Sequence, residues 1–193
     1  RRIGNEYLFQ MQADQNIHNF EKYDEKKIVT QCPHCLTTLK KDYAEIGTEL
    51  EVMHHSEFIS DLIKQGKIEP EASVDEDITF HDACYVGRHH GEYDAPRDVL
   101  QSVLSEKATI KEMPRNKEES FCCGAGGGNM WYEIKQGKRI NVERFEEAIE
   151  TGVKKVATSC NFCMIMMEDG RKVTGQDENM EVYDIAELVA ERI

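Results

Sequence analysis

Residues 154–163, KKVATSCNFC, decide how the chain folds, because they read as a short strand that runs directly into a C-x-x-C pair. The small and β-branched residues Val156-Ala157-Thr158 predict a buried strand, and the residues after Cys160 predict a helix. Two thiols at such a helix start lie at the carboxyl edge of a parallel sheet, where α/β proteins bind ligands. The stretch therefore predicts both a fold class and the place of a functional site.

Short strands alternate with helical patterns along the rest of the chain. Further strands are expected at 28–30, 50–53, 78–80 and 181–183, and helices from about 33, over 57–65 and over 95–104. This alternation indicates an α/β fold with largely parallel sheets, built from Rossmann-like units with the functional site at the carboxyl edge of the strands.

One such unit occurs twice. In residues 26–62 and again in residues 154–189, a Lys-Lys-led strand runs into C-x-x-C and a helix, and a Glu-Val strand then leads into another helix. We interpret this as a pseudo-twofold repeat, with residues 1–70 as the C-terminal part of a truncated first unit and residues 71–193 as a complete second unit. Cysteines that would complete the first unit would have to precede Arg1, so we expect a C-terminal fragment of a longer protein.

The composition excludes several classes of function. A net charge of −13 over 193 residues disfavours nucleic acid as a partner. No stretch approaches the roughly 20 apolar residues that span a bilayer, and the N-terminus has no signal-peptide core. Seven cysteines, four of them in C-x-x-C pairs, favour metal ligation or redox chemistry in a reducing, cytoplasmic compartment over a secreted disulfide framework.

Thiolates are soft ligands that suit iron–sulfur clusters, zinc and copper(I). In residues 121–128, FCCGAGGG, two adjacent thiols rarely bind one tetrahedral zinc together, but they can bind two irons of one cluster. The glycines that follow allow close backbone approach and N–H donation to sulfur; the run also resembles a phosphate loop, but it lacks the G-K-[ST] ending. We expect an iron–sulfur cluster, with a structural zinc site as the alternative, at Cys84, Cys122, Cys123, Cys160 and Cys163.

The order of these cysteines, C-x(n)-C-C-G-x(m)-C-x-x-C, resembles the cysteine-rich CCG domain that occurs twice in one of the subunits of heterodisulfide reductase. Residues 81–89, HDACYVGRH, and 93–97, YDAPR, are similar to a closer branch of heterodisulfide-reductase-related Fe–S oxidoreductases linked to electron-transfer flavoprotein and acyl-CoA dehydrogenases. The resemblance implies that the five cysteines hold a [4Fe–4S] cluster of the non-cubane type.

The resemblance also implies a route for electrons. The donor would be electron-transfer flavoprotein or another flavoprotein, and the acceptor would be (mena)quinone or a disulfide. Such proteins are membrane-anchored through segments upstream of their CCG units, which implies a position at the cytoplasmic face of the membrane. Two alternatives stay open: a disulfide reductase of the heterodisulfide type acting at the cluster, and a zinc-stabilised interaction module that carries no electrons.

Several residues have weaker predicted roles. Cys32 and Cys35 are either half of a second metal site or a pair of thiols without metal. His81, with Asp82, and Gly124 are expected beside the ligands, orienting them or hydrogen-bonding around the cluster. His54 and His55, aligned with Tyr183 and Asp184, are expected at a strand end, either handling protons or packed. Trp131 and Tyr132 are expected to pack against the glycine run and shield the site.

Overall fold

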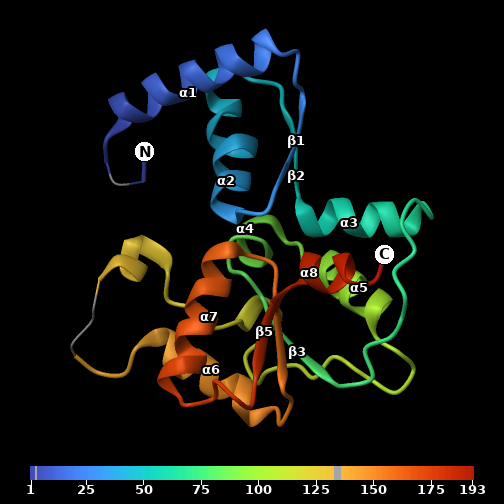
Figure 1. Ribbon diagram of the computed structural model, residues 1–193. Coiled ribbons are helices and arrows are strands. Elements are labelled where there is room, and N and C mark those ends of the chain that lie inside the picture. The colour runs from blue at the N-terminus through green and yellow to red at the C-terminus, as the bar shows by residue number, and fades with distance from the viewer. Residues whose placement is uncertain (3, 133–135) are drawn as a thin grey trace.

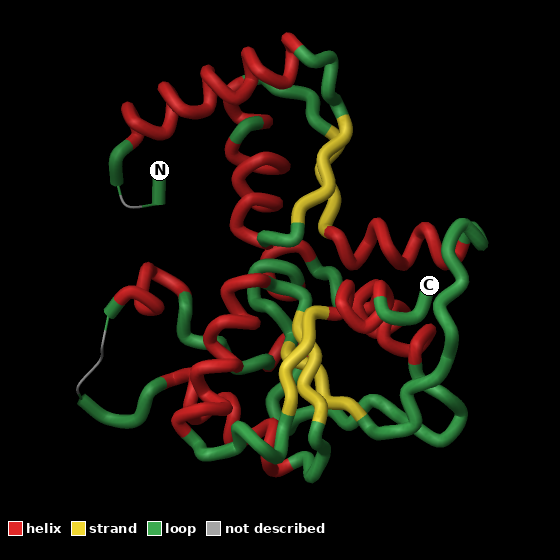
Figure 2. The backbone as a smooth tube through the Cα atoms, viewed as in Figure 1, coloured by secondary structure: helices red, strands yellow, loops and turns green. Residues whose placement is uncertain are grey.

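Within residues 1–2, 4–132 and 136–193, which the computed structural model describes, five short strands form two parallel sheets (Figures 1 and 2). The strands are β1 (Lys27–Thr30), β2 (Glu51–His54), β3 (Ile78–His81), β4 (Lys155–Thr158) and β5 (Glu181–Asp184). The helices are α1 (Glu6–Lys22), α2 (Pro33–Thr37), α3 (His55–Lys64), α4 (Gly87–His90), α5 (Asp94–Val103), α6 (Ile140–Glu150), α7 (Asn161–Val173) and α8 (Ile185–Ala190). The predicted α/β class with parallel strands is confirmed.

The larger sheet has the order β3-β4-β5 and is covered on both faces. Phe80 and Ala157 are paired across β3 and β4 and belong to the core formed with α5 and α8. Val156 and Val182 belong to a second core, formed with α6 and α7. Strands buried on both faces explain why β4 reads as a continuous run of small and β-branched residues instead of an alternating one.

Helices α6 and α7 pack closely, and a glycine permits their approach. A Cβ atom added at Gly170 would lie 2.8 Å from the backbone oxygen of Asn141 and 2.9 Å from Cβ of Phe145. Any side chain at Gly170 would therefore push α7 away from α6. This packing matters for function because α7 carries the C-x-x-C pair of the larger sheet.

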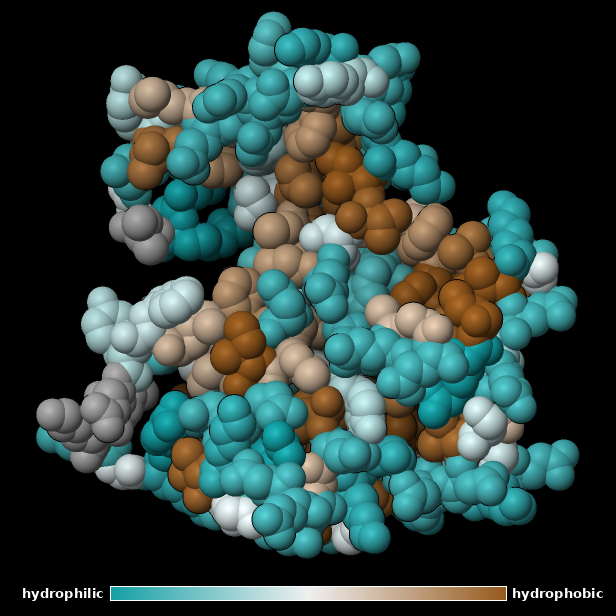
Figure 3. All heavy atoms as spheres, viewed as in Figure 1, coloured by the Kyte–Doolittle hydropathy of each residue, from teal (hydrophilic) through white to brown (hydrophobic). Residues whose placement is uncertain are grey.

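The smaller sheet pairs β1 with β2 in the register that β4 and β5 use. Ile28 lies opposite Val52, as Val156 lies opposite Val182. The sheet is less covered: Val29 is 40% exposed, and hydrophobic residues are visible over this region in Figure 3. The pairing agrees with the repeat, but the smaller sheet has no counterpart of β3 among the described residues, so the twofold relation of whole units and the boundary at residue 70 stay predictions.

The second strand of each copy ends in a helix cap. His54 caps α3 and Asp184 caps α8, and each forms a capping box with a glutamate three residues later, Glu57 or Glu187. The alignment of His54 with Tyr183 was therefore wrong by one residue, because the strand pairing and the caps equate His54 with Asp184. Val52 and Val182 hold equivalent places in the two pairs of strands, and the second residue after each is His54 or Asp184.

The carboxyl ends of the two sheets point toward each other across a shared junction (Figure 1). His55 Nε2 lies 3.1 Å from Asp184 Oδ1, and the rings of His34 and Phe162, from the two C-x-x-C segments, are 5.5 Å apart. Helix α3 packs against α5 and α8, so the first copy contributes to the core of the second. In the part of the chain that the structure describes, no helix has the length and apolarity needed to cross a bilayer.

Candidate metal centre

The five cysteines of the predicted cluster site line one small cavity of about 30 Å³ at the carboxyl edge of the larger sheet. Cys84 follows β3, Cys122 and Cys123 lie in the loop before the glycine run, and Cys160 and Cys163 begin α7. Cys123, Cys160 and Cys163 are buried, and Cys84 and Cys122 are half-buried. All five are free thiols, so the structure brings together a set of soft ligands that no disulfide occupies.

The thiols interact with one another. Cys123 Sγ and Cys163 Sγ are 3.3 Å apart. Hydrogen bonds from Cys123 and then Cys84 lower the pKa of Cys122, and a hydrogen bond from Cys163 lowers the pKa of Cys160. Hydrogen bonds from neighbouring thiols therefore stabilise the deprotonated forms of Cys122 and Cys160. Binding of a metal or cluster would displace these protons, so it is favoured at higher pH.

Gly124 supports the thiolate of Cys122 through its backbone. Its N–H donates to Cys122 Sγ at 3.3 Å, and its φ of +92° is in the left-handed region that favours glycine. A Cβ atom at this position would lie 3.1 Å from Cβ of Ile140 and 3.3 Å from the backbone nitrogen of Asn141. The loop can therefore approach the start of α6 only with glycine here.

We expect Gly124→Ala to lower both stability and metal loading. Strain at positive φ and crowding against α6 should reduce the free energy of unfolding by about 1–3 kcal/mol and shift the N–H away from Cys122. Urea denaturation and the iron content after anaerobic reconstitution measure the two effects. Gly152→Ala is the matched control, because Gly152 also has positive φ (+74°) but open space around it. It should lower stability and leave iron content unchanged; equal iron loss in both variants would contradict the role of Gly124.

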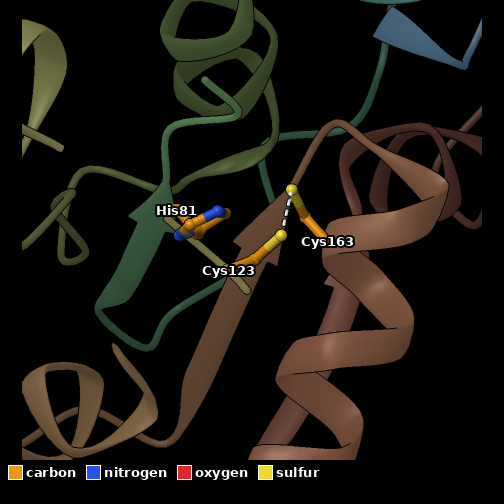
Figure 4. A group of neighbouring side chains, drawn as sticks. All are labelled: His81, Cys123 and Cys163. Atoms are coloured by element: carbon orange, nitrogen blue, oxygen red, sulfur yellow. Dashed lines mark hydrogen bonds between the residues drawn. The ribbon is translucent and has the colours of Figure 1, made fainter. Parts of the chain in front are cut away.

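His81 lies against the buried pair of thiols (Figure 4). It ends β3 and is fully buried, and one of its ring nitrogens lies within 4.8 Å of the sulfurs of Cys123 and Cys163. Its Nδ1 accepts a hydrogen bond of 2.9 Å from Nε of Arg144, while its Nε2 is buried with no partner among the described residues. A buried donor without a partner costs about 1–3 kcal/mol, so this atom marks a place where a ligand atom is expected.

Arg144 was not identified from the sequence. It lies on α6, is fully buried, and donates to Glu147 and to the backbone oxygen of Arg115 as well as to His81. Burial, and then the charge of Arg144, lower the pKa of His81 well below its ordinary value, so the ring is neutral. The sequence shows only an arginine on the apolar side of a helix. This pattern is equally compatible with an exposed arginine, so it does not single out Arg144.

Asp82, the neighbour of His81, contacts Arg97 and Lys117 and not the thiols. Both of its carboxylate oxygens accept hydrogen bonds from Arg97, at 2.8 and 2.9 Å, and one also accepts from the backbone N–H of Lys117. This arrangement ties α5 and the following loop to the end of β3. Of the two residues, His81 is the one that faces the cysteines.

Cys32 and Cys35 do not line the cavity, but the two residues between them do. Cys32 is half-buried, Cys35 is exposed, and Pro33 and His34 form part of the cavity wall. The ring of His34 lies 4.2 Å from that of Tyr85, which also lines the cavity. His34 holds the same place in its C-x-x-C segment as Phe162 holds in the other, so the repeat in the sequence already pairs these two rings.

The expectation that Trp131 and Tyr132 shield the site was wrong. Their side chains are 77% and 72% exposed. The two residues follow Gly127 and Gly128, which both have positive φ values. The aromatic wall of the cavity is formed instead by His34, Tyr85 and Phe162.

A larger cavity of about 650 Å³ lies elsewhere, between α1 and residues 46–50. Its lining contains carboxylates such as Asp14 and Glu21 and apolar residues such as Ile17 and Phe20, and no thiol or histidine. It has no group suited to a soft metal, so the cysteine cavity is the candidate metal centre.

Comparison with known proteins agrees with this site. The model of a family described as a cysteine-rich domain, CCG, matches residues 1–40 and 78–168. The matched stretches contain both C-x-x-C pairs, Cys84 and the Cys122-Cys123 pair.

Curated relatives match over nearly the whole chain. It is 44% identical over 193 residues to the "Probable iron-sulfur-binding oxidoreductase FadF" of Bacillus subtilis, covering 100% of this chain and 27% of that protein. It is 40% identical to the "EtfAB:quinone oxidoreductase" of Syntrophomonas wolfei, covering 98% and 27%. It is 39% identical to one of the subunits of the "Dihydromethanophenazine:CoB--CoM heterodisulfide reductase" of Methanosarcina mazei, covering 94% and 44%. The chain thus spans about a quarter of the first two relatives and less than half of the third.

Proposed function

Because the chain belongs to the family of the cysteine-rich CCG domain, we propose that it is an iron–sulfur electron-transfer module of an oxidoreductase. The ligands of the cluster are the cysteines that line the cavity, Cys84, Cys122, Cys123, Cys160 and Cys163. The observation that carries the proposal is that these five free thiols, from three separate segments, converge on one cavity. Cys32 and Cys35 do not line this cavity and are not part of the proposed ligand set.

The donor set fits an iron–sulfur cluster better than zinc. A tetrahedral zinc site uses four ligands, and two of them are rarely adjacent in sequence, whereas five thiolates that include Cys122 and Cys123 suit several irons. The cluster is proposed to be [4Fe–4S], of the non-cubane type that the family resemblance implies. Such a cluster supplies one-electron chemistry when it is bound.

The residues around the cavity control that chemistry. The N–H of Gly124 and the buried ring of His81 are polar groups next to sulfur, which stabilise negative charge there. Cys163 and Cys123 lie in a buried apolar cluster with Ala83, Val86 and Met166, which keeps water from that side. The half-buried Cys84 and Cys122 lie on the more open side, toward which electrons are exchanged.

The proposed route of electrons is from electron-transfer flavoprotein, or another flavoprotein, toward a quinone. Support comes from the 40% identity to a protein whose name contains both EtfAB and quinone. Because the chain spans only 27% of that relative, the quinone site and any membrane anchor would belong to other segments, with this module at the cytoplasmic face. Reduction of a disulfide at the cluster is the second candidate, favoured by the 39% identity to a component of a heterodisulfide reductase.

Anaerobic purification with analysis of iron, zinc and acid-labile sulfide tests the proposal. We expect iron and sulfide in a ratio near one and an EPR signal in one of the two redox states. A soluble menaquinone analogue should oxidise the reduced protein. In a separate assay with a disulfide, the reduced protein should form no thiol products. Zinc without sulfide would contradict the cluster, and thiol formation from a disulfide would favour the second candidate.

A further inference from the structure

The contact between Arg144 and His81 decides what His81 can do at the metal centre. The Nε–H of Arg144 points at Nδ1 of His81 at 2.9 Å, and a guanidinium group has donors only. Nδ1 must therefore use its lone pair to accept this hydrogen bond. In a neutral imidazole the single ring hydrogen then lies on Nε2.

The orientation of Arg144 is itself fixed. Its Nη1 donates to the backbone oxygen of Arg115 at 2.8 Å and also to the carboxylate of Glu147, one turn further along α6. The side chain is fully buried, so water does not compete for these contacts. The guanidinium group cannot turn away from His81 without breaking both of them.

We propose that Arg144 is a positioning residue that makes His81 a hydrogen-bond donor to sulfur at this centre, and that His81 is not a metal ligand. Nδ1 is occupied by Arg144 and Nε2 carries the hydrogen, so neither nitrogen offers a lone pair to a metal. Nε2 is buried without a partner among the described residues, and one ring nitrogen of His81 lies within 4.8 Å of the sulfurs of Cys123 and Cys163. The redox consequence of this proposal rests on the proposed cluster. The direction of the hydrogen bond from Arg144 to His81 does not depend on the cluster.

The consequence is electrostatic. A hydrogen bond to a cluster sulfur or to a ligating thiolate stabilises the more negative, reduced state and raises the reduction potential. His81 acts directly on the sulfur, and Arg144 acts only through His81. Their substitutions should therefore change the potential in the same direction, and the double variant should change it no further than His81→Phe alone.

The first experiment needs no cluster. Long-range ¹H–¹⁵N NMR of the reduced, metal-free protein reports which nitrogen of each histidine carries hydrogen, and His81→Phe assigns the signal. We expect the Nε2–H form for His81 at neutral pH. A hydrogen on Nδ1, or on both nitrogens, would overturn the proposal whatever the cofactor proves to be.

The second experiment uses the cluster-loaded protein. His81→Phe should keep the iron content and lower the reduction potential measured by EPR titration, while His18→Phe, on the exposed face of α1, should change neither. Arg144→Gln should shift the potential part of the way; if it fails to fold, His81→Phe still decides the outcome. Loss of iron in His81→Phe, or a strong ¹⁵N hyperfine coupling from His81 in the unmodified protein, would show direct ligation and overturn the proposal.

Discussion

Replacing Cys123 with serine is expected to remove the cluster or convert it to a different type, with a clear loss of iron and acid-labile sulfide. Cys123 is buried, its Sγ lies 3.3 Å from Sγ of Cys163, and it lines the cavity with the other four thiols. Serine is a hard oxygen donor that retains its proton, so it would be a poor replacement for a thiolate ligand of iron. Iron and sulfide analysis with EPR after anaerobic reconstitution measures the loss.

The fold should survive this substitution. Cys123 belongs to a small apolar cluster near the cavity, separate from the two cores that hold the larger sheet. Far-UV circular dichroism should therefore be unchanged. Cys35→Ser is the matched control, because Cys35 is exposed and does not line the cavity. An unchanged iron content and spectrum in Cys123→Ser, or equal losses in both variants, would exclude Cys123 as a ligand of this site.

The fold was predictable where local pattern and topology agree. Val156-Ala157-Thr158 was predicted as a strand, and the C-x-x-C pair that follows it was predicted to lie at the carboxyl edge of a parallel sheet. The order of the five cysteines, together with the resemblance to the CCG domain, predicted that they lie together. The structure brings all five to one cavity, and their role as cluster ligands stays a proposal.

The contacts that the sequence did not predict join distant segments. Arg144 meets His81 across 63 positions, and His55 meets Asp184 across 129. No periodicity or motif encodes such pairs, because each residue alone is also compatible with an exposed helix or strand end. Trp131 and Tyr132 show the opposite error: their aromatic chemistry suggested burial, but both residues are exposed.

The junction between the two sheets should make the protein less stable in acid because of His54. Its side chain is fully buried, with Nδ1 2.7 Å from Oγ of Ser56 and Nε2 3.3 Å from the backbone oxygen of Gln31. Burial, and then the neighbouring His55, lower the pKa of His54 from 6.5 to about 3. Asp184 also faces this site, but its pKa is lowered from 3.8, so it stays charged above that pH.

The sign follows from proton binding. Below pH 6.5 the unfolded chain binds a proton at His54, whereas the folded chain binds it only below about pH 3. Between these pH values acid therefore favours unfolding. The contribution of this one group should reduce the free energy of unfolding by about 1.4 kcal/mol per pH unit between pH 6 and pH 4. Urea denaturation of the metal-free protein at several pH values measures the slope.

His54→Asn isolates this contribution, because asparagine can still cap α3 but does not titrate. The variant should be less stable than the unmodified protein at pH 7.5, where the histidine contacts are intact. Its free energy of unfolding should fall less steeply in acid, because the contribution of one titrating group is missing. The difference between the two proteins should therefore shrink as the pH falls from 6 to 4. His18→Asn, on the exposed side of α1, should keep the original slope. Parallel pH profiles for His54→Asn and the unmodified protein would mean that His54 is protonated in the folded junction, which its buried contacts oppose.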